Sequence, residues 1–278
     1  MSIEEIVKQT LQEDIGSGDH SSLACIDKSI MGKMKLLVKE DGVLCGVEVA
    51  KEVIRQVDPE IRMTQYLHDG DLIHKGDIVF DLEGPAQSML TAERTLLNFM
   101  QRMSGIATNS KKYSDAVKGT KTKILDTRKT TPGLRIFEKY AVQIGGSENH
   151  RFGLYDMIML KDNHIDFAGG IEKAIDTTHE YLNKNNLDLK IEIETRNLEE
   201  VKRVIEHGGV NRIMLDNFTP EMILVALRMI NGKYETEASG GITFENIRGY
   251  AESGVDFISI GALTHHIKSL DLSLKFVK

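Results

Sequence analysis

Residues 191–216 read IEIETRNLEEVKRVIEHGGVNRIMLD, and this stretch decides the fold class. Two short apolar runs, IEIE at 191–194 and RIML at 212–215, flank a segment with the apolar spacing of an amphipathic helix. A strand, a helix and a second strand in this order are typical of a βαβ unit with parallel strands. The stretch therefore predicts a parallel sheet covered by helices.

The same alternation continues on both sides of this unit. Short apolar runs recur as KILDT at 123–127, MIML at 157–160, TEAS at 236–239 and DFISI at 256–260, each followed by a loop and an amphipathic segment. These repeats predict an α/β barrel with six to seven strands, fewer than the eight strands of a complete barrel.

The chain before this region has another pattern. Ser2 and Glu5 have the spacing of a capping box, which predicts a helix that ends at Gly16. Short β-like runs fill residues 31–82, and Gly84-Pro85 opens a long helical stretch whose apolar face continues toward Gly105. We therefore expect a small separate domain of helices and strands ahead of the barrel.

Composition excludes several classes of protein. The 278 residues are 41% hydrophobic and carry a net charge of −7, which argues against a nucleic-acid coat or a protein of anionic membranes. Cys25 and Cys45 have no CxxC spacing and are expected to be small apolar residues in a reducing cytosol. The sequence shows neither a signal-peptide pattern nor a long apolar run, so we expect a cytoplasmic, non-membrane protein.

Charged and small residues directly follow the predicted barrel strands. The carboxyl ends of parallel barrel strands meet at one rim, where barrel enzymes have their active sites. The residues at these positions are Arg128-Lys129, Lys161-Asp162-Asn163-His164, Glu194, Asp216-Asn217, Ser239-Gly240-Gly241 and Gly261-Ala262. Their charged and small side chains at one rim predict an enzyme.

The residue types at this rim indicate a polyanionic ligand. Arginine and lysine bind carboxylates and phosphates, and the basic residues here are Arg128, Lys129, His150, Arg151 and Lys161. The alternative is ordinary solvated charge paired with acidic residues. The glycine-containing runs EASGGI and ISIGAL lie where barrels bind phosphate, although each could also be a plain tight turn.

Glu194 and Asp216 end neighbouring predicted strands and could bind Mg²⁺ together with substrate phosphates. Glu192 shares a strand face with Glu194 and is its rival as a ligand. In the alternative interpretation, the two carboxylates pair with Lys129 and Lys161.

Seven ordered motifs resemble one known family, quinolinate phosphoribosyltransferase. They are ERTLLNFMQRMSGIAT, ILDTRKTTPGLR, EKYAVQIGGSENHRFGLYDMIMLKDNHI, IEIET, IMLDNF, EASGGI and ISIGALTHH, and they cover nearly the whole chain. The resemblance implies transfer of phosphoribosyl from phosphoribosyl pyrophosphate to quinolinate. Nicotinate mononucleotide, CO₂ and pyrophosphate form in this Mg²⁺-dependent step of NAD biosynthesis.

The resemblance also implies an architecture. An N-terminal α/β sandwich over residues 1–110 would join the incomplete barrel over residues 111–268, and the tail 269–278 would pack back on the sandwich. Homodimers or homohexamers are expected, in which the N-terminal domain of one subunit caps the barrel rim of another.

The motifs transfer site residues to this chain. The implied quinolinate pocket contains Arg128, His150, Arg151 and Lys161, with Arg94 from the partner subunit. Phosphoribosyl pyrophosphate and its metal would contact Lys129, Glu194, Asp216, Ser239, Gly240, Gly261 and His265. Catalytic roles are expected for Lys129, Lys161, Glu194 and Asp216. Gln143 and Ser147 stand where the family commonly has arginine and glycine, so the conformation and charge of that loop differ from the family pattern.

Three other functions stay open. A pyrophosphorylase-like relative from molybdenum-uptake operons would share the fold and the phosphoribosyl site. A barrel aldolase would use Lys161 as a Schiff-base lysine over a phosphate site. A non-catalytic phosphosugar-binding protein would keep Ser239 and Gly261 and would not need Arg94, Arg128 and Arg151.

Overall fold

The computed structural model describes residues 1–277 and divides the chain into two compact units. The first unit contains residues 1–112, residues 130–146 and the chain from residue 263 onward, and the second contains residues 113–129 and 147–262. The segments 130–146 and 263–268, which the predicted boundary assigns to the barrel, thus belong to the first unit. Each compact unit is therefore built from segments that are not consecutive in the chain.

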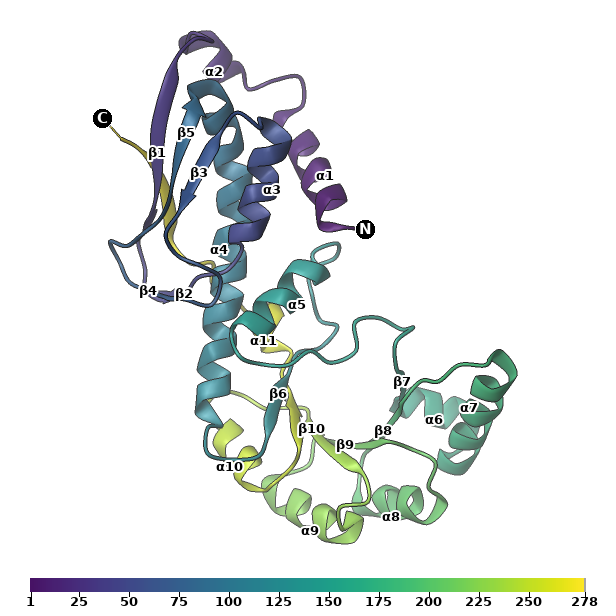
Figure 1. The fold of residues 1–278 in the computed structure, drawn as a ribbon. Coiled ribbons are helices and arrows are strands. Elements are labelled where there is room, and N and C mark those ends of the chain that lie inside the picture. Colours follow the sequence, from purple (N-terminus) through teal and green to yellow (C-terminus); the bar gives the residue numbers. More distant parts are fainter. Residues whose placement is uncertain (278) are drawn as a thin grey trace. The chain divides into compact units, whose positions relative to one another are not determined.

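The first unit is built around an antiparallel sheet in the order β12-β1-β5-β3 (Figure 1). Its strands are β1 (Met31–Val38), β3 (Arg62–Gln65), β5 (Ile78–Pro85) and β12 (Leu272–Phe276), and β2 (Gly42–Val43) pairs separately with β4 (Leu72–Ile73). The C-terminal strand β12 pairs with β1, with Leu36 opposite Leu274. Met34, Leu36 and Val38 alternate toward the core, as expected for a sheet with one buried face.

Helices complete this unit. They are α1 (Ile3–Ile15), α2 (His20–Cys25), α3 (Val47–Val57), most of α4 (Ala86–Ala116), α5 (Arg135–Ile144) and most of α11 (Ala262–His265). The capping box at the start of α1 is confirmed, because Ser2 Oγ accepts the Glu5 amide at 3.2 Å and Glu5 Oε2 accepts the Ser2 amide at 2.7 Å.

The helix α4 continues through Gly105 to Ala116, although the apolar pattern was strongest before that glycine. A Cβ atom at Gly105 would lie 2.3 Å from the carbonyl oxygen of Lys268. Glycine is therefore needed here because another part of the backbone passes against the helix, and it does not end the helix.

The second unit confirms the predicted parallel βα architecture. Its six strands have the order β6-β11-β10-β9-β8-β7, and neighbouring strands pair in parallel (Figure 1). They are β6 (Lys123–Leu125), β7 (Ile158–Leu160), β8 (Ile191–Thr195), β9 (Arg212–Asp216), β10 (Glu235–Ser239) and β11 (Phe257–Ser259). Within residues 1–277 the edge strands β6 and β7 do not pair with each other, so the barrel is incomplete.

Helices follow the strands of this unit and lie outside the curved sheet in Figure 1. They are α6 (Asp162–Ala168), α7 (Ile171–Asn185), α8 (Leu198–His207), α9 (Pro220–Ile230) and α10 (Ile247–Glu252). The central strand β8 is buried along its whole length. Both faces of β8 are covered, so the side chains that point to either face of the strand are buried.

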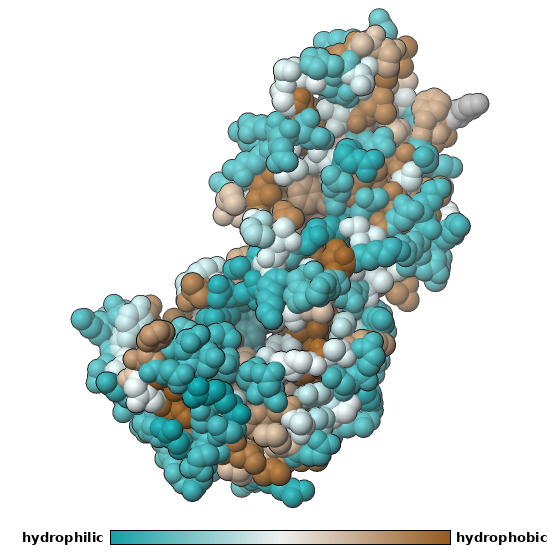
Figure 2. Space-filling view, turned by 180° about the vertical axis from the view of Figure 1, so that it is seen from behind, coloured by the Kyte–Doolittle hydropathy of each residue, from teal (hydrophilic) through white to brown (hydrophobic). Residues whose placement is uncertain are grey.

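Hydrophilic side chains cover most of the face shown in Figure 2, and hydrophobic residues occur there as small, separate areas. In the described part of the chain, no helix combines the length and the apolar composition that crossing a membrane requires.

The close approach at Gly105 generates a stability prediction. Alanine normally stabilises a helix interior by about 1 kcal/mol relative to glycine, but Gly105→Ala should cost roughly 1–3 kcal/mol because the added Cβ meets backbone. Gly249→Ala is the matched control, since its Cβ would have only Pro220 Cγ nearby, at 3.9 Å. Urea unfolding followed by circular dichroism should show a lower midpoint for Gly105→Ala alone. An unchanged or higher midpoint would contradict the close contact.

Candidate active site at the carboxyl rim of the barrel

Eight of the predicted site residues lie at the carboxyl ends of the barrel strands or in the loops that follow them. They are Arg128, Lys129, Lys161, Glu194, Asp216, Ser239, Gly240 and Gly261. We call this end of the second unit the carboxyl rim. Parallel pairing brings the residues together, since β8 aligns Thr195 with Leu215 of β9, and β9 aligns Asp216 with Ser239 of β10.

His150 and Arg151 reach the carboxyl rim by a different route. They precede β7, and an isolated parallel bridge between Glu148 and Leu125 places their segment beside β6. The His150 amide then donates to Asp126 Oδ1 at 2.8 Å. This buried aspartate, directly after β6, thus anchors the segment that carries both basic residues.

Glu194 and Asp216 form the acidic part of the rim, and Lys161 pairs with Glu194 there. Lys161 Nζ lies 2.9 Å from Glu194 Oε2, and the Lys161 amide donates to His164 Nδ1 at 2.9 Å at the start of α6. Burial raises the pKa of Asp216, and the nearby charge of Glu194 raises it further. The Lys161 ammonium, which pairs with Glu194, acts in the opposite direction and lowers the pKa of Asp216. The carboxylate oxygens of Glu194 and Asp216 are ligands that Mg²⁺ prefers.

Arg128 and Arg151 form the basic part of the rim. Arg151 is half-buried, and its Nη1 donates to the Met157 carbonyl at 3.2 Å. Burial lowers the pKa of Arg151, and the positive charge of Arg128 lowers it further. Since like charges repel, two neighbouring guanidinium groups, one of them partly removed from water, favour an anionic ligand.

The loop after β10 shows why the sequence has glycine there. Gly240 has φ +87°, and a Cβ atom at this position would lie 2.3 Å from Asn217 Oδ1. Asn217 itself has φ +57° and donates its amide to the Ser239 carbonyl at 2.8 Å. Glycine leaves the backbone accessible for close approach, as phosphate-binding loops at this end of barrels require.

Arg94 and His265 belong to the first unit. Arg94 is exposed on α4, and the His265 ring lies on α11 with its centroid 4.4 Å from that of His266. Their predicted contacts with substrate stay predictions.

His150 is more deeply placed than the sequence suggested. Its side chain is 4% exposed, and Nε2 lies 2.9 Å from Glu192 Oε2 and 3.3 Å from Glu237 Oε2. We call His150, Glu192, Glu237 and Arg212 the interior network, because Arg212 Nη1 donates to Glu237 Oε2 at 2.9 Å. Sequence reasoning weighed Glu192 only as a rival metal ligand and missed Glu237 and Arg212, although glutamate inside the strand runs IEIE and ETEAS was a signal.

The donor atoms of His150, Glu192 and Glu237 lie within 4.8 Å of one another, a spacing that a metal ion could use. The Arg212 guanidinium already supplies positive charge to Glu237 at 2.9 Å. His150, Glu192 and Glu237 are almost completely buried, whereas Asp216 is partly exposed at the rim. Glu194 with Asp216 is therefore the better candidate pair for a metal ion that arrives with substrate phosphates.

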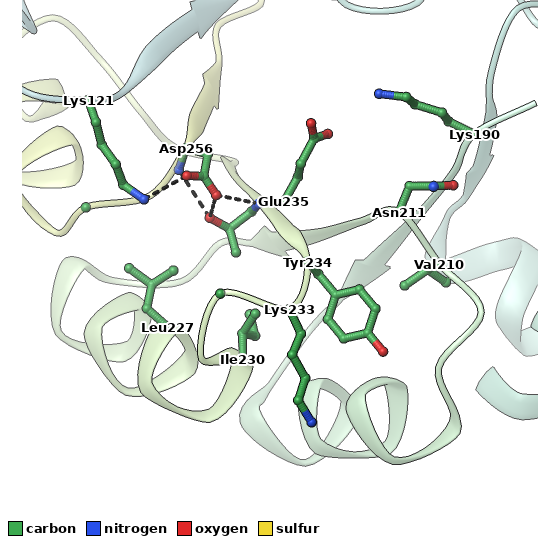
Figure 3. Close-up of a pocket in the computed structure, with 13 residues that line it drawn as sticks. Lys121, Lys190, Val210, Asn211, Leu227, Ile230, Lys233, Tyr234, Glu235 and Asp256 are labelled. Carbon is green, nitrogen blue, oxygen red and sulfur yellow. Dashed lines mark hydrogen bonds and ion pairs between the residues drawn. The ribbon is translucent and has the colours of Figure 1, made fainter.

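A separate pocket of about 650 Å³ lies at the opposite, amino-terminal end of the strands (Figure 3). Lys121, Lys190, Tyr234 and Asp256 are among its lining residues, and Lys121 Nζ lies 2.7 Å from Asp256 Oδ1. None of the predicted site residues lines it, and its lysines point in different directions in Figure 3. This pocket is therefore separate from the candidate active site at the carboxyl rim.

Comparisons with known proteins cover both units. Residues 19–104 match the model of the quinolinate phosphoribosyl transferase N-terminal domain, and residues 106–275 match that of the C-terminal domain. The chain belongs to the quinolinate phosphoribosyltransferase family.

Relatives and solved structures agree with this assignment. The nicotinate-nucleotide pyrophosphorylase [carboxylating] of Arabidopsis thaliana is 46% identical over 98% of this chain and 82% of its own length. The probable enzyme of that name from Bacillus subtilis is 40% identical over 99% and 93%. The structure of the Francisella tularensis nicotinate-nucleotide pyrophosphorylase superposes with a TM-score of 0.92, at 42% identity over 99% of this chain and 96% of that one.

Membership of the quinolinate phosphoribosyltransferase family confirms the resemblance that the seven motifs carried. The match extends to both units, and the Francisella tularensis structure covers 99% of the chain.

The environment of Asp216 generates a pH prediction. Its pKa in the folded chain lies above the ordinary value of 3.8, so its charged form is penalised by folding. That penalty is absent below the ordinary pKa and grows as the pH rises through the folded one. Without divalent cations, Asp216→Asn should therefore raise the thermal midpoint at neutral pH, where about 2–4 °C corresponds to about 1 kcal/mol, and should have little effect near pH 3. Asp188→Asn, in an exposed loop, is the control. A lower midpoint for Asp216→Asn at neutral pH would refute the penalty.

Proposed function

We propose that this chain transfers the phosphoribosyl group of phosphoribosyl pyrophosphate to quinolinate and releases nicotinate mononucleotide, CO₂ and pyrophosphate, as a step of NAD biosynthesis. The observation that carries the proposal is the match to both family domains over residues 19–104 and 106–275. The charge pattern of the carboxyl rim supports it, since both substrates are strongly anionic.

Recognition of quinolinate follows from the basic residues. Quinolinate carries two adjacent carboxylates, whereas nicotinate carries one. Arg128 and Arg151 lie close enough for their charges to interact, and a pair of guanidinium groups can bind two carboxylates with directed hydrogen bonds. Leaving one such cation without a partner is costly in a partly dry pocket, so the pair would discriminate against nicotinate. Lys161 would add a third cation.

Phosphoribosyl transfer forms a bond between the ring nitrogen of quinolinate and ribose C1, and it breaks the bond from C1 to pyrophosphate. Positive charge develops on the sugar and negative charge on the leaving group. Lys129 would stabilise the leaving group, and Glu194 and Asp216 would lie near the sugar. Mg²⁺, held by Glu194 and Asp216, would neutralise pyrophosphate when bound. Ser239, Gly240, Gly261 and His265 would bind the 5-phosphate.

Decarboxylation follows because the ring nitrogen is now quaternary. The bond from ring C2 to its carboxylate breaks, CO₂ leaves, and the electron pair stays on C2, where the neighbouring positive nitrogen stabilises it until C2 takes a proton. The protein's part is to orient the carboxylate through the basic residues and to limit the access of water.

The three alternatives have less support. Curated relatives at 40–46% identity carry names for nicotinate-nucleotide pyrophosphorylase or quinolinate phosphoribosyltransferase, and none of those reported is a molybdenum-uptake protein. Lys161 forms an ion pair with Glu194 at 2.9 Å, whereas a Schiff-base lysine requires an uncharged amine. A plain phosphosugar-binding protein has no need of the Arg128 and Arg151 pair.

A turnover assay tests the activity. With phosphoribosyl pyrophosphate and Mg²⁺, quinolinate should yield CO₂ and pyrophosphate in equal amounts, measured from carboxyl-labelled substrate and a coupled pyrophosphate assay. Arg151→Ala should lower kcat/KM for quinolinate by roughly 100-fold, because it removes a charged hydrogen-bond donor worth about 3 kcal/mol. Exposed Arg228→Ala, on α9, is the control. Turnover with nicotinate but not with quinolinate would reject the proposal.

We further propose that the active site is shared between subunits and that Arg94 enters the site of the partner subunit. If Arg94 acts in the partner's site, mixing inactive Arg94→Ala with inactive Lys161→Ala should restore activity through hybrid dimers. Random exchange makes half of the dimers hybrids with one intact site each, so about a quarter of wild-type activity is expected. Subunit exchange would be verified by mass spectrometry of differently tagged chains. Exchange without recovery would place Arg94 in its own subunit's site or outside the site.

The magnesium dependence, the oligomeric state and the cytoplasmic location stay predictions.

A further inference from the structure

The interior network joins the amino-terminal end of the barrel to the carboxyl rim. At the amino-terminal end of the barrel, Arg212 Nη2 lies 3.0 Å from Glu235 Oε2, and Glu235 lines the pocket of Figure 3. The Arg212 guanidinium lies 4.0 Å from the centre of the Phe257 ring. Arg212 Nη1 then donates to Glu237 Oε2 at 2.9 Å. Glu237 and Glu192, on β10 and β8, both face the His150 ring.

Both ring nitrogens of His150 face protein groups. Nε2 lies 2.9 Å from Glu192 Oε2 and 3.3 Å from Glu237 Oε2, and Nδ1 accepts the amide hydrogen of Arg151 at 2.7 Å. An acceptor at Nδ1 carries no proton, so these contacts assign the ring proton to Nε2. Glu192 and Glu237 thus lie against the Nε2 side of the ring, and the Nδ1 side binds the backbone of Arg151.

Burying the carboxylates of Glu192 and Glu237 inside the barrel costs free energy, because both groups lose their contact with water. Glu192 and Glu237 are 0% exposed, on strands whose neighbouring side chains are mostly apolar or small. Well-packed apolar residues of similar volume would often be as stable or more stable than buried ion pairs. Their burial therefore calls for a role other than stability. The network reaches the rim through His150, whose backbone amide binds Asp126 and whose ring accepts the amide of Arg151, a predicted substrate-binding residue.

We propose that Glu192 and Glu237 are positioning residues that place Arg151 for quinolinate through the ring of His150. Neither carboxylate touches substrate. Together they fix the orientation and tautomer of the ring, so that Nδ1 accepts the Arg151 amide and the guanidinium is presented beside Arg128. His150 is then a positioning residue as well. This inference rests on the proposed function for its ligand and on the structure for its geometry.

Glu192→Gln and Glu237→Gln test the proposal, because each removes one carboxylate charge at nearly constant volume. Glu235→Gln is the matched control: it lies on the same strand as Glu237 and contacts Arg212, but not His150. Circular dichroism and thermal unfolding would first show that each variant is folded. Each test variant changes one of the two carboxylates beside His150 Nε2, so one folded variant is sufficient.

The first readout does not depend on activity. Hydrogen exchange at the Arg151 amide, followed by mass spectrometry with fragmentation, should be about tenfold faster or more in Glu192→Gln and Glu237→Gln than in wild type, and unchanged in Glu235→Gln. Unchanged exchange in a folded test variant would overturn the positioning role. This arm holds even if the chain proves to use another substrate, which would defeat only the proposed function.

The second readout is kinetic. Each test variant should raise the KM for quinolinate by about tenfold or more, as a misplaced binding group does, with the KM for phosphoribosyl pyrophosphate little changed. In an Arg151→Ala background, Glu192→Gln should have no further effect on quinolinate, because its route of action is gone. An equal effect in both backgrounds, or an equal rise in both KM values, would show that Glu192 acts otherwise.

Discussion

The hydrogen-bond register between parallel strands is the constraint on which the site depends. Glu194 and Asp216 are separated by a complete helix in the sequence, yet they end neighbouring strands because β8 pairs with β9. The same register places Asp216 beside Ser239 of β10. A slip of one residue would turn the alternate side chains of a strand to its other face, so the chemistry of the rim requires correct pairing along the whole sheet.

Electrostatics divides the second unit into layers. The rim contains a basic pair, Arg128 and Arg151, and an acidic pair, Glu194 and Asp216, in which Lys161 pairs with Glu194. The like charges within each pair favour a ligand of opposite charge. A chain with net charge −7 can therefore bind two anionic substrates, because the average charge of a surface does not describe a partly dry local site. The initial inference from net charge excludes nucleic-acid coats, but it does not exclude small polyanions.

Beneath the rim, the interior network shows a second use of buried charge. Arg212 and the His150 ring face the carboxylates of Glu192 and Glu237. Buried charges are costly to desolvate and lose much of their compensation if a partner moves, so such networks tolerate few arrangements. A substrate-binding arginine placed on this support has less freedom than one on an ordinary surface loop.

The sequence by itself determined the fold class and most of the rim. The βα repeats around 191–216 predicted the parallel sheet, and residues directly after apolar runs, such as Lys161, Glu194 and Asp216, identified its functional end, because both signals are local in the chain. Tertiary structure alone decided which distant segments meet. It showed that Gly105 accommodates the backbone at Lys268, that 130–146 packs with the first unit, and that His150 lies over Glu192 and Glu237. These contacts depend on packing between residues far apart in the sequence, where no local pattern of propensity or periodicity records the partner.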